Sequence, residues 1–503
     1  MTTVLDLGLD VGSTYVKGQL SDDAGRTLPA VRRPTPWIAV GGSGHGGRTE
    51  MSAHALVGTV HEILHDVADQ VRTVAADARV RAIGVTGMAE SGALLRRQTD
   101  RPASGDGRTA AADNVVRPVV AWFDTRGADA LATLCADGSG ASAPDALDPG
   151  AFGPDAFDTA FRRHTGLPFD PLASFAKLLT FRREGLDLNG LEWLNVPELV
   201  AHVLGGLRRR EPSLAGRTGL IDHETQSAWP ATLDALGVGP DLLPPALPAG
   251  SVWGHADASV PEPLRGAVLT VAGHDHLVAS LAAGVHRPDE LYASMGTAEA
   301  LVRVLEHPLD PEARDRLAAR GVDVVPHVLP ERAVMLAGTR TGLLLRRVLQ
   351  LVGVHDADGR AALDDAVMAL SAVPDGLSVH GAANDDGALS VRADTDGLSP
   401  AALFTATLEH SSAALRDVLA VMDSEVPPAR RTVVAGGWAQ MRSVRRARAR
   451  DLPGVTWAHG HEEGAALGAA QLAAFAADTT TRDPAPFLAS RLPTTPPPIG
   501  GTA

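Results

Sequence analysis

The spacing of apolar and polar residues repeats one device in both halves of the chain. In residues 4–20, an apolar run leads into a short polar bend at 10–14 and is followed by a second apolar run. Residues 291–305 show the same order, with the bend at 294–297. Short apolar runs bounded by glycine-containing bends are typical of paired strands. The pattern predicts two β-hairpins, each of which opens one half of the protein.

Strand-like and helix-like periodicities alternate along the rest of the chain. Helical spacing is found in four segments: 52–76, 157–184 with a break near 168–171, 277–283 and 464–470. Strand-like runs are found in four others: 80–86, 115–121, 268–272 and 432–435. Such alternation is typical of α/β architecture. We expect two lobes, 1–284 and 285–477, followed by a disordered, proline-rich tail over 478–503.

Length and charge narrow the class of protein. A chain of 503 residues is too long for one hydrophobic core, which supports two domains and a cleft between them. The formal net charge of −15 argues against a nucleic-acid-binding surface. No apolar run approaches the roughly 18 residues of a membrane span. With a single cysteine, Cys135, no internal disulfide can form, so we expect a cytoplasmic protein. The charge and the short apolar runs lead us to expect that it binds neither nucleic acid nor membrane.

The bend of the first hairpin carries the residue types of a phosphate site. Gly12 permits a sharp turn and a close approach of the backbone, while Ser13 and Thr14 offer hydroxyl and amide donors. Asp10 is suited to holding Mg²⁺, and Lys17, one of only two lysines in the chain, adds a positive charge. A plain hairpin with a polar bend is the alternative.

Two further glycine segments follow predicted strands. Gly273, His274 and Asp275 follow the strand at 268–272, and Asp275 either faces a cleft or caps the next helix. Gly436 and Gly437 follow the strand at 432–435, where paired glycines suit close approach to a nucleotide. We interpret the small-residue helix over 464–470 as packing beneath that nucleotide, with an ordinary core helix as the alternative.

In order and spacing, these segments resemble the motifs of the FGGY family of carbohydrate kinases over nearly the whole chain. The matching positions are Asp10 to Lys17 for the first phosphate motif, Gly273-His274-Asp275 for the catalytic motif, Gly296-Thr297 for the second phosphate turn and Gly436-Gly437 for the adenosine motif. Trp438 stands where many members have a third glycine. The resemblance implies an α/β fold of two actin-like ATPase (ribonuclease H-like) domains with an interdomain cleft.

The same resemblance implies ATP and Mg²⁺ as cofactors and a small sugar or polyol as substrate, with a ketose favoured. Asp275 would be the general base that takes a proton from the attacking hydroxyl, and Asp10 and Asp275 would hold the metal. The nucleotide would be bound by ten residues: Gly12, Ser13, Thr14, Lys17, Gly296, Thr297, Gly338, Gly436, Gly437 and Trp438. A homodimer is compatible with the resemblance and stays open.

The sugar would lie against segments 85–92 and 121–126. Met88 and Trp122 offer apolar surfaces, and Glu90 and Asp124 can accept hydrogen bonds from hydroxyls. Arg126 completes a Trp-x-Asp-x-Arg pattern that resembles the family's substrate segment, although Asp124 and Arg126 could also be a simple ion pair. Members specific for xylulose usually have Gln-Met-His-Gly where this chain has Gly-Met-Ala-Glu at 87–90, a departure that argues against D-xylulose.

Three alternatives stay open. Segment 42–49 resembles a P-loop in which Arg48 occupies the lysine position. The planar guanidinium of arginine is a poor substitute for the compact ammonium of lysine at such a site. An actin-like ATPase of the chaperone or filament type would share the phosphate hairpins. A catalytically silent sugar sensor would share the sugar pocket. The presence of both Asp10 and Asp275 favours a kinase.

Overall fold

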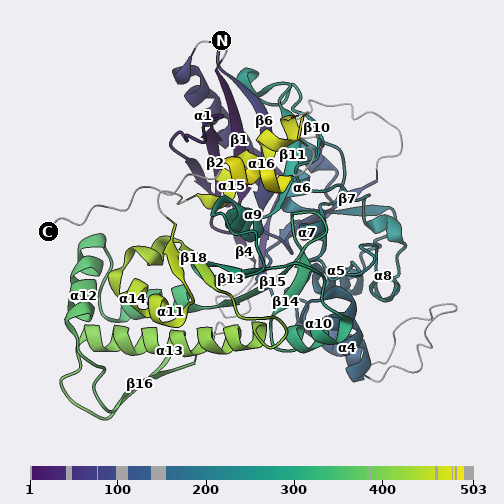
Figure 1. The fold of residues 1–503 in the computed structure, drawn as a ribbon. Helices are drawn as coiled ribbons and strands as arrows, with labels where there is room; N and C mark the ends of the chain where they lie inside the picture. The colour runs from purple at the N-terminus through teal and green to yellow at the C-terminus, as the bar shows by residue number, and fades with distance from the viewer. Residues whose placement is uncertain are drawn as a thin grey trace.

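Two six-stranded sheets form the framework of the protein, and Figure 1 shows one above the other. The computed structural model describes residues 3–40, 48–75, 77–97, 111–136, 154–381, 383, 387–458, 463–478, 480–481 and 484–491. Most of the segment that resembles a P-loop, residues 42–47, therefore lies outside the described residues.

The first sheet contains the first predicted hairpin and has the strand order β10-β11-β6-β1-β2-β3. Its strands are β1 (Val4–Val11), β2 (Tyr15–Ser21), β3 (Val31–Pro34), β6 (Arg79–Gly87), β10 (Gly254–His255) and β11 (Val268–His274). Strand β1 pairs antiparallel with β2 and parallel with β6, which in turn pairs parallel with β11. The hairpin is thus confirmed, and parallel strands extend it on the β1 side.

The second sheet repeats this arrangement with the order β14-β15-β13-β12-β18-β19. Its strands are β12 (Glu290–Met295), β13 (Glu299–Leu305), β14 (Asp323–Pro326), β15 (Ala333–Thr339), β18 (Arg431–Ala435) and β19 (Val455–Trp457). Strand β12 pairs antiparallel with β13 and parallel with β18, as β1 does with β2 and β6. The expected α/β class with two sheet-containing domains is confirmed. We refer to the parts built around these sheets as the first and second lobes.

Shorter strands and the helices complete the described elements. The shorter strands are β4 (Ile38–Val40), β5 (Arg48–Met51), β7 (Gly92–Arg96), β8 (Val119–Val120), β9 (Leu191–Asn195), β16 (Leu377–His380) and β17 (Ser390–Ala393). The helices are α1 (Ala53–Val74), α3 (Ala128–Ala136), α4 (Pro154–Thr165), α5 (Ser174–Arg183), α6 (Val196–Val203), α7 (Pro212–Ala215), α8 (Pro230–Leu236), α9 (Asp275–Ala282), α10 (Pro311–Ala318), α11 (Thr341–Leu351), α12 (Ala357–Ala369), α13 (Pro400–Met422), α14 (Arg442–Asp451), α15 (Gly464–Ala477) and α16 (Pro484–Arg491), with 3-10 turns η2 (Pro240–Leu242), η3 (Glu262–Leu264) and η4 (Gly437–Gln440). The strand expected over 115–121 shrinks to β8, because Pro118 lacks the N–H that a ladder requires.

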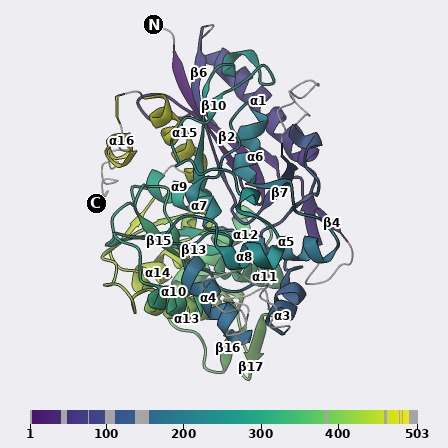
Figure 2. The ribbon, with the colours of Figure 1, turned by 90° about the vertical axis from the view of Figure 1, so that its right-hand side faces the viewer.

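Helices cover both faces of the first sheet. Helix α1 contacts β2 and β3, and α6 contacts β6 and β11, whereas α15 contacts β1, β6 and β11. Figure 2 shows α1 and α15 on opposite sides of this sheet. The face toward α1 is closely packed, since a Cβ placed on Gly18 of β2 would lie 2.9 Å from Cγ2 of Ile63.

Helix α15 returns from the end of the second lobe to the first sheet, where it packs against β1, β6 and β11. A Cβ on Gly8 would lie 1.8 Å from the carbonyl oxygen of Ala466, and one on Gly84 would lie 2.1 Å from that of Ala469. Small residues on both sides therefore allow the helix backbone to touch the sheet. The proline-rich tail also contains an ordered part, because Phe487 and Leu488 of α16 are buried.

The glycine contact gives a direct test of this docking. We expect Gly8→Ala to lower the free energy of unfolding by about 3 kcal/mol, because the new methyl group meets the backbone of α15. Gly58→Ala is the matched control, since nothing lies within 4 Å of a Cβ there and alanine favours helix α1 by about 0.5–1 kcal/mol. Urea unfolding of both variants measures the difference. Equal stability of the two variants would contradict the docking.

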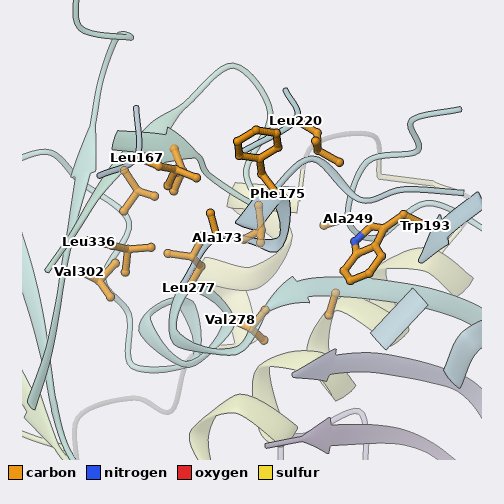
Figure 3. Close-up of a cluster of buried hydrophobic side chains, with 14 of the residues drawn as sticks. Leu167, Ala173, Phe175, Trp193, Leu220, Ala249, Leu277, Val278, Val302 and Leu336 are labelled. Carbon is orange, nitrogen blue, oxygen red and sulfur yellow. The ribbon is translucent and has the colours of Figure 1, made fainter. Parts of the chain in front are cut away.

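A shared hydrophobic core joins the two lobes. Leu277 and Val278 of α9 belong to one buried cluster with Val302 of β13 and Leu336 of β15, as Figure 3 shows. A backbone hydrogen bond of 2.7 Å from Val324 of β14 to the carbonyl of Gly166 adds a second junction. The lobes are therefore packed together at the base of the cleft. Within the described part of the chain, no helix combines the length and the apolar character needed to cross a bilayer.

Candidate active site

The bend between β1 and β2 is held from outside by the segment that follows β3. Thr35 donates its hydroxyl to the carbonyl of Gly12 at 2.6 Å and its N–H to the carbonyl of Thr14 at 3.0 Å. The indole Nε1 of Trp37 donates to the carbonyl of Ser13 at 2.8 Å. The carbonyls of the bend are thus occupied, while the N–H groups of Ser13 and Thr14 have no partner among the described residues. Free N–H groups at a bend of this kind suit an anion.

Beside this bend lies a small charged group. The Nζ of Lys17 is 3.6 Å from Oδ2 of Asp10 and 2.6 Å from Oε2 of Glu463, which precedes α15. Burial raises the pKa of the Asp10 carboxyl to about 7, against the charge of Lys17, and the nearby carboxylates of Asp275 and Glu463 raise it further. Oδ1 of Asp10 is buried and has no hydrogen-bond partner among the described residues. Glu463 was not identified as a site residue from the sequence, because only the docking of α15 brings it to this bend.

Asp275 lies where β11 ends and α9 begins. Its Oδ1 accepts the backbone N–H of His276 at 2.7 Å and is 3.3 Å from Nε2 of His274. Burial acts to raise the pKa of this carboxyl, but His276, His274 and Lys17 outweigh it and hold the pKa below its usual value. Oδ2 accepts no hydrogen bond from the described residues. A second carboxylate oxygen therefore remains available beside the phosphate bend.

A buried set of hydrogen bonds fixes this junction between strand and helix. Ser213 donates its hydroxyl to Oε2 of Glu211 at 2.5 Å and accepts the N–H of His274 at 3.1 Å. Gly273 has φ 104°, and a Cβ there would lie 2.4 Å from Cγ1 of Val328. Glycine is therefore required two residues before Asp275 for both conformational and steric reasons.

The buried Glu211 predicts a dependence of stability on pH. Burial raises its pKa from 4.5 to about 7, and Oε1 has no partner among the described residues. An acid whose folded pKa is raised stabilises the fold below its unfolded pKa and loses that contribution as pH rises through the folded value. We expect about 3 kcal/mol to be lost between pH 4.5 and 8, and Glu211→Gln to remove most of this decline. Urea unfolding at several pH values measures it.

The neighbouring Glu198 also makes the folded state less stable as pH rises, because burial raises its pKa to about 8. Glu62→Gln is the control, since that side chain is 67% exposed. Parallel pH profiles for the wild type and Glu211→Gln would contradict the buried protonated state.

Asp275 opens into a cavity of about 380 Å³ between the lobes. Six residues expected at the site line it: Ser13, Met88, Glu90, Trp122, Asp275 and Gly338. The second lobe contributes Asp323 and Arg340 to the wall, and the first lobe adds the charged side chains of Asp170 and Arg217. A volume of this size accepts a small molecule.

An ion triad crosses the cavity from one lobe to the other. Arg217 donates Nε to Oε1 of Glu90 at 2.5 Å, and its Nη1 pairs with Oδ2 of Asp323 on β14. Glu90 has φ 59°, a strained value for a residue with a side chain. Burial raises the pKa of Glu90 against the opposing charge of Arg217, and it also raises the pKa of Asp170 to about 6. No sequence motif marked Arg217, Asp323 or Asp170.

Asp124 and Arg126 do not line this cavity. Oδ2 of Asp124 accepts the N–H of Thr49 at 2.7 Å, and both oxygens are also bonded by the Arg126 guanidinium. Arg126 in turn donates to Glu50 at 2.6 Å. The two side chains form a buried internal pair, so the ion-pair alternative describes them better than contact with substrate.

A second cavity, of about 580 Å³, lies in the second lobe. The expected residues Gly296, Thr297, Gly437 and Trp438 line it, together with Arg346 and Arg360. Gly436 has φ 101°, and a Cβ there would lie 2.5 Å from the carbonyl of Met295. These glycines bring backbone to the cavity surface, as a bound nucleotide requires.

Both cofactors implied by the resemblance are compatible with these residues. Mg²⁺ in phosphate-binding sites usually takes one or two carboxylates and completes its shell with water and phosphate. Asp10, with its unpartnered Oδ1, and the nearby Asp275 supply such a pair. No group of three or more His, Cys, Asp or Glu side chains suited to a metal occurs among the described residues. The donor set therefore fits a metal that depends on phosphate for its remaining ligands.

Comparison with known proteins places this geometry in a structural class. No family model matches the chain. It is 33% identical over 139 residues to the autoinducer-2 kinase of Escherichia coli K12 and 30% identical over 139 residues to that of Yersinia enterocolitica. Each alignment covers 27% of this chain and 25% of the relative, so the chain spans about a quarter of the length of these curated relatives.

Solved structures align over almost the whole length. Xylulose kinase from Rhodospirillum rubrum has a TM-score of 0.76 at 21% identity, covering 97% of this chain and 92% of that one. Gluconate kinase from Lactobacillus acidophilus has a TM-score of 0.76 at 17% identity with the same coverage, and Plasmodium falciparum glycerol kinase with ADP has 0.76 at 14%, covering 94% and 90%. The chain therefore has the two-domain fold of the FGGY-type carbohydrate kinases, as its motifs indicated.

Proposed function

We propose that this protein phosphorylates a hydroxyl group of a small sugar or polyol, most simply a ketose, with ATP as donor. The observation that carries the proposal is the position of Asp275, whose carboxylate faces the interlobe cavity beside the bend of Ser13 and near Asp10 and Lys17. The similar fold of xylulose, gluconate and glycerol kinases supports it.

In this mechanism Asp275 orients the attacking hydroxyl and accepts its proton through Oδ2. Its lowered pKa keeps the carboxylate ionised at neutral pH. Phosphoryl transfer has a loose transition state, so proton removal contributes less than alignment and neutralisation of charge. The free N–H groups of Ser13 and Thr14, with Lys17, stabilise the transferred phosphoryl group. Bound Mg²⁺, held by Asp10 and Asp275, would neutralise phosphate charge.

The nucleotide occupies the second cavity, with its phosphates directed toward the first hairpin. Gly296 and Thr297 at the second bend approach the phosphates, and Gly437 and Trp438 contact the nucleoside, with Gly436 directly before them in the chain. Gly338 on β15 lies at the wall of the sugar cavity. Gly12 allows the first bend to turn toward the same phosphates.

The sugar is recognised by acceptor oxygens and one aromatic face. Oε2 of Glu90, Oδ1 of Asp323 and Oδ2 of Asp170 have no hydrogen-bond partner among the described residues, so each can accept a hydroxyl. Met88 and Trp122 cover the carbon chain. Since Arg217 is already paired with two carboxylates, its charge is not available to an anionic substrate.

ADP release measured against a panel of ketoses, aldoses and polyols tests this function. D-glucitol and D-gluconate form a matched pair, since they differ in carrying an alcohol or a carboxylate at one end. Sugar-dependent ADP release with a neutral member supports the proposal. ATP hydrolysis that is independent of sugar would favour an ATPase module, and sugar binding without ADP release would favour a sensor. We also propose a cytoplasmic location, where ATP and free sugars are available.

A further inference from the structure

The indole of Trp122 connects the sugar cavity to the phosphate bend. Its Nε1 donates a hydrogen bond of 2.7 Å to Oγ of Ser13, and both side chains line the cavity. The two residues are 109 positions apart in the sequence, and each belongs to a different expected motif. Trp122 therefore does more than offer an apolar face to a sugar.

The chemistry of this hydrogen bond sets the direction of the Ser13 hydroxyl. An indole N–H can only donate, so Oγ of Ser13 must be the acceptor. A serine hydroxyl carries one hydrogen, which then has to point to another partner. No described residue accepts it, and Ser13 borders the cavity. The hydroxyl hydrogen is thus free to be directed toward the space where a phosphoryl group meets a sugar hydroxyl.

Trp122 is itself firmly held, as a positioning residue must be. Nζ of the buried Lys177 donates to the carbonyl of Trp122 at 3.2 Å. The ring of Phe123 packs edge-on against the indole at 5.6 Å, and the Arg340 guanidinium of the second lobe lies over it at 5.8 Å. The buried pair of Asp124 and Arg126 anchors the next turn of chain. These contacts hold the Trp-x-Asp-x-Arg segment in place, although only its tryptophan lines the cavity.

We propose that Trp122 is a positioning residue for phosphoryl transfer: its N–H fixes the Ser13 hydroxyl so that this hydroxyl donates to the transferred phosphoryl group. The inference rests on the proposed kinase function. The hydrogen bond from Trp122 to Ser13 would couple the wall of the sugar site to the phosphate bend. The directions of the Trp122 N–H and of the Ser13 hydroxyl hydrogen follow from hydrogen bonding alone. No covalent bond of the protein is formed or broken.

A double-mutant cycle tests the proposal. Trp122→Phe keeps an aromatic face but removes the N–H, and Ser13→Ala removes the hydroxyl. We expect each change to lower kcat on the order of 10- to 100-fold, the value of a hydrogen bond to a charged group, with the KM for sugar nearly unchanged. The double variant should be no slower than either single variant, because both changes remove the same interaction.

Trp37→Phe is the matched control for the cycle. It also removes an indole N–H from the same bend, but that N–H donates to the carbonyl of Ser13 and not to its hydroxyl. Its effect should multiply with that of Ser13→Ala, so this pair should show no coupling. Thermal unfolding of all five variants identifies any that are merely destabilised.

A binding measurement gives a second readout that needs no turnover. Calorimetry without sugar compares the affinities for ADP and for a non-hydrolysable ATP analogue. Trp122→Phe and Ser13→Ala should each weaken binding of the analogue relative to ADP by the same factor, and their combination should weaken it no further. In the variant that combines Trp37→Phe with Ser13→Ala, the effects of the two single changes should instead add. Additive kcat losses for Trp122→Phe and Ser13→Ala, or a change in sugar KM alone, would overturn the proposal. An inactive wild type across the whole sugar panel would instead reject the kinase function.

Discussion

Asp275→Asn is expected to lower sugar-dependent ADP release by about 10²- to 10⁴-fold, the usual contribution of a positioned acid or base. The amide keeps the size of the side chain, but it cannot take up a proton and offers one acceptor oxygen in place of two. Oδ1 is engaged by the N–H of His276, so the oxygen lost to the substrate is Oδ2. Steady-state ADP release at saturating ATP and sugar measures the effect.

Asp170→Asn is the matched control for this change. Asp170 lines the same cavity, but its partner is the N–H of Leu172 at 2.8 Å, away from the phosphate bend. Its replacement should raise the KM for sugar while kcat changes little. ADP binding should remain close to wild type in both variants. If Asp275→Asn retained full turnover, the assignment of the base would be wrong.

The parts of this site that depend on local turn chemistry could be predicted from the sequence. Gly12 and Gly296 mark tight bends between strands, and both hairpins were confirmed. Gly273 has a positive φ directly before His274 and Asp275, which is why a glycine occurs at that point of the motif. Bends of this kind are determined by a few neighbouring residues, so they can be recognised without knowledge of the remaining fold.

The parts that depend on long-range packing could not be predicted in this way. The small residues of α15 indicate close packing but not the partner, and the helix docks on Gly8 and Gly84 of the distant first sheet. That docking brings Glu463 to Lys17. Arg217 and Asp323 are 106 residues apart and belong to no periodic pattern. Their proximity results from the packing of two lobes, which no local sequence signal records.

The pair of Asp124 and Arg126 illustrates a different limit of prediction from the sequence. Acidic and basic side chains that can bind a sugar can equally well form an ion pair with each other. Here both oxygens of the Asp124 carboxylate accept hydrogen bonds from Arg126, and Oδ2 also accepts the N–H of Thr49. Composition and spacing predict a functional segment but cannot assign the donor and acceptor partners. The structure assigns contact with the cavity to Trp122 and an anchoring role to the two charged residues.

Arg217→Met is expected to destabilise the protein by about 3–5 kcal/mol and to raise the KM for sugar at least tenfold. The side chains of Arg217, Glu90 and Asp323 are only 15%, 7% and 17% exposed, so removal of the cation leaves two poorly solvated carboxylates facing each other. Their repulsion acts across the lobes and also releases Glu90 from the orientation in which it meets the substrate. Urea unfolding and sugar titration of the same variant measure both effects.

A second variant separates charge burial from loss of packing. Arg217→Met combined with Asp323→Asn should recover part of the stability, because one of the two unpaired carboxylates is then neutral. Arg162→Met is the control, since Arg162 also links the lobes, at 2.6 Å from Asp315, but outside the sugar cavity. It should leave the KM for sugar unchanged, because Arg162 does not line the sugar cavity. If Arg217→Met bound sugar as tightly as Arg162→Met does, the ion triad would have no part in recognition, and the carboxylates of the cavity wall would serve only to join the lobes.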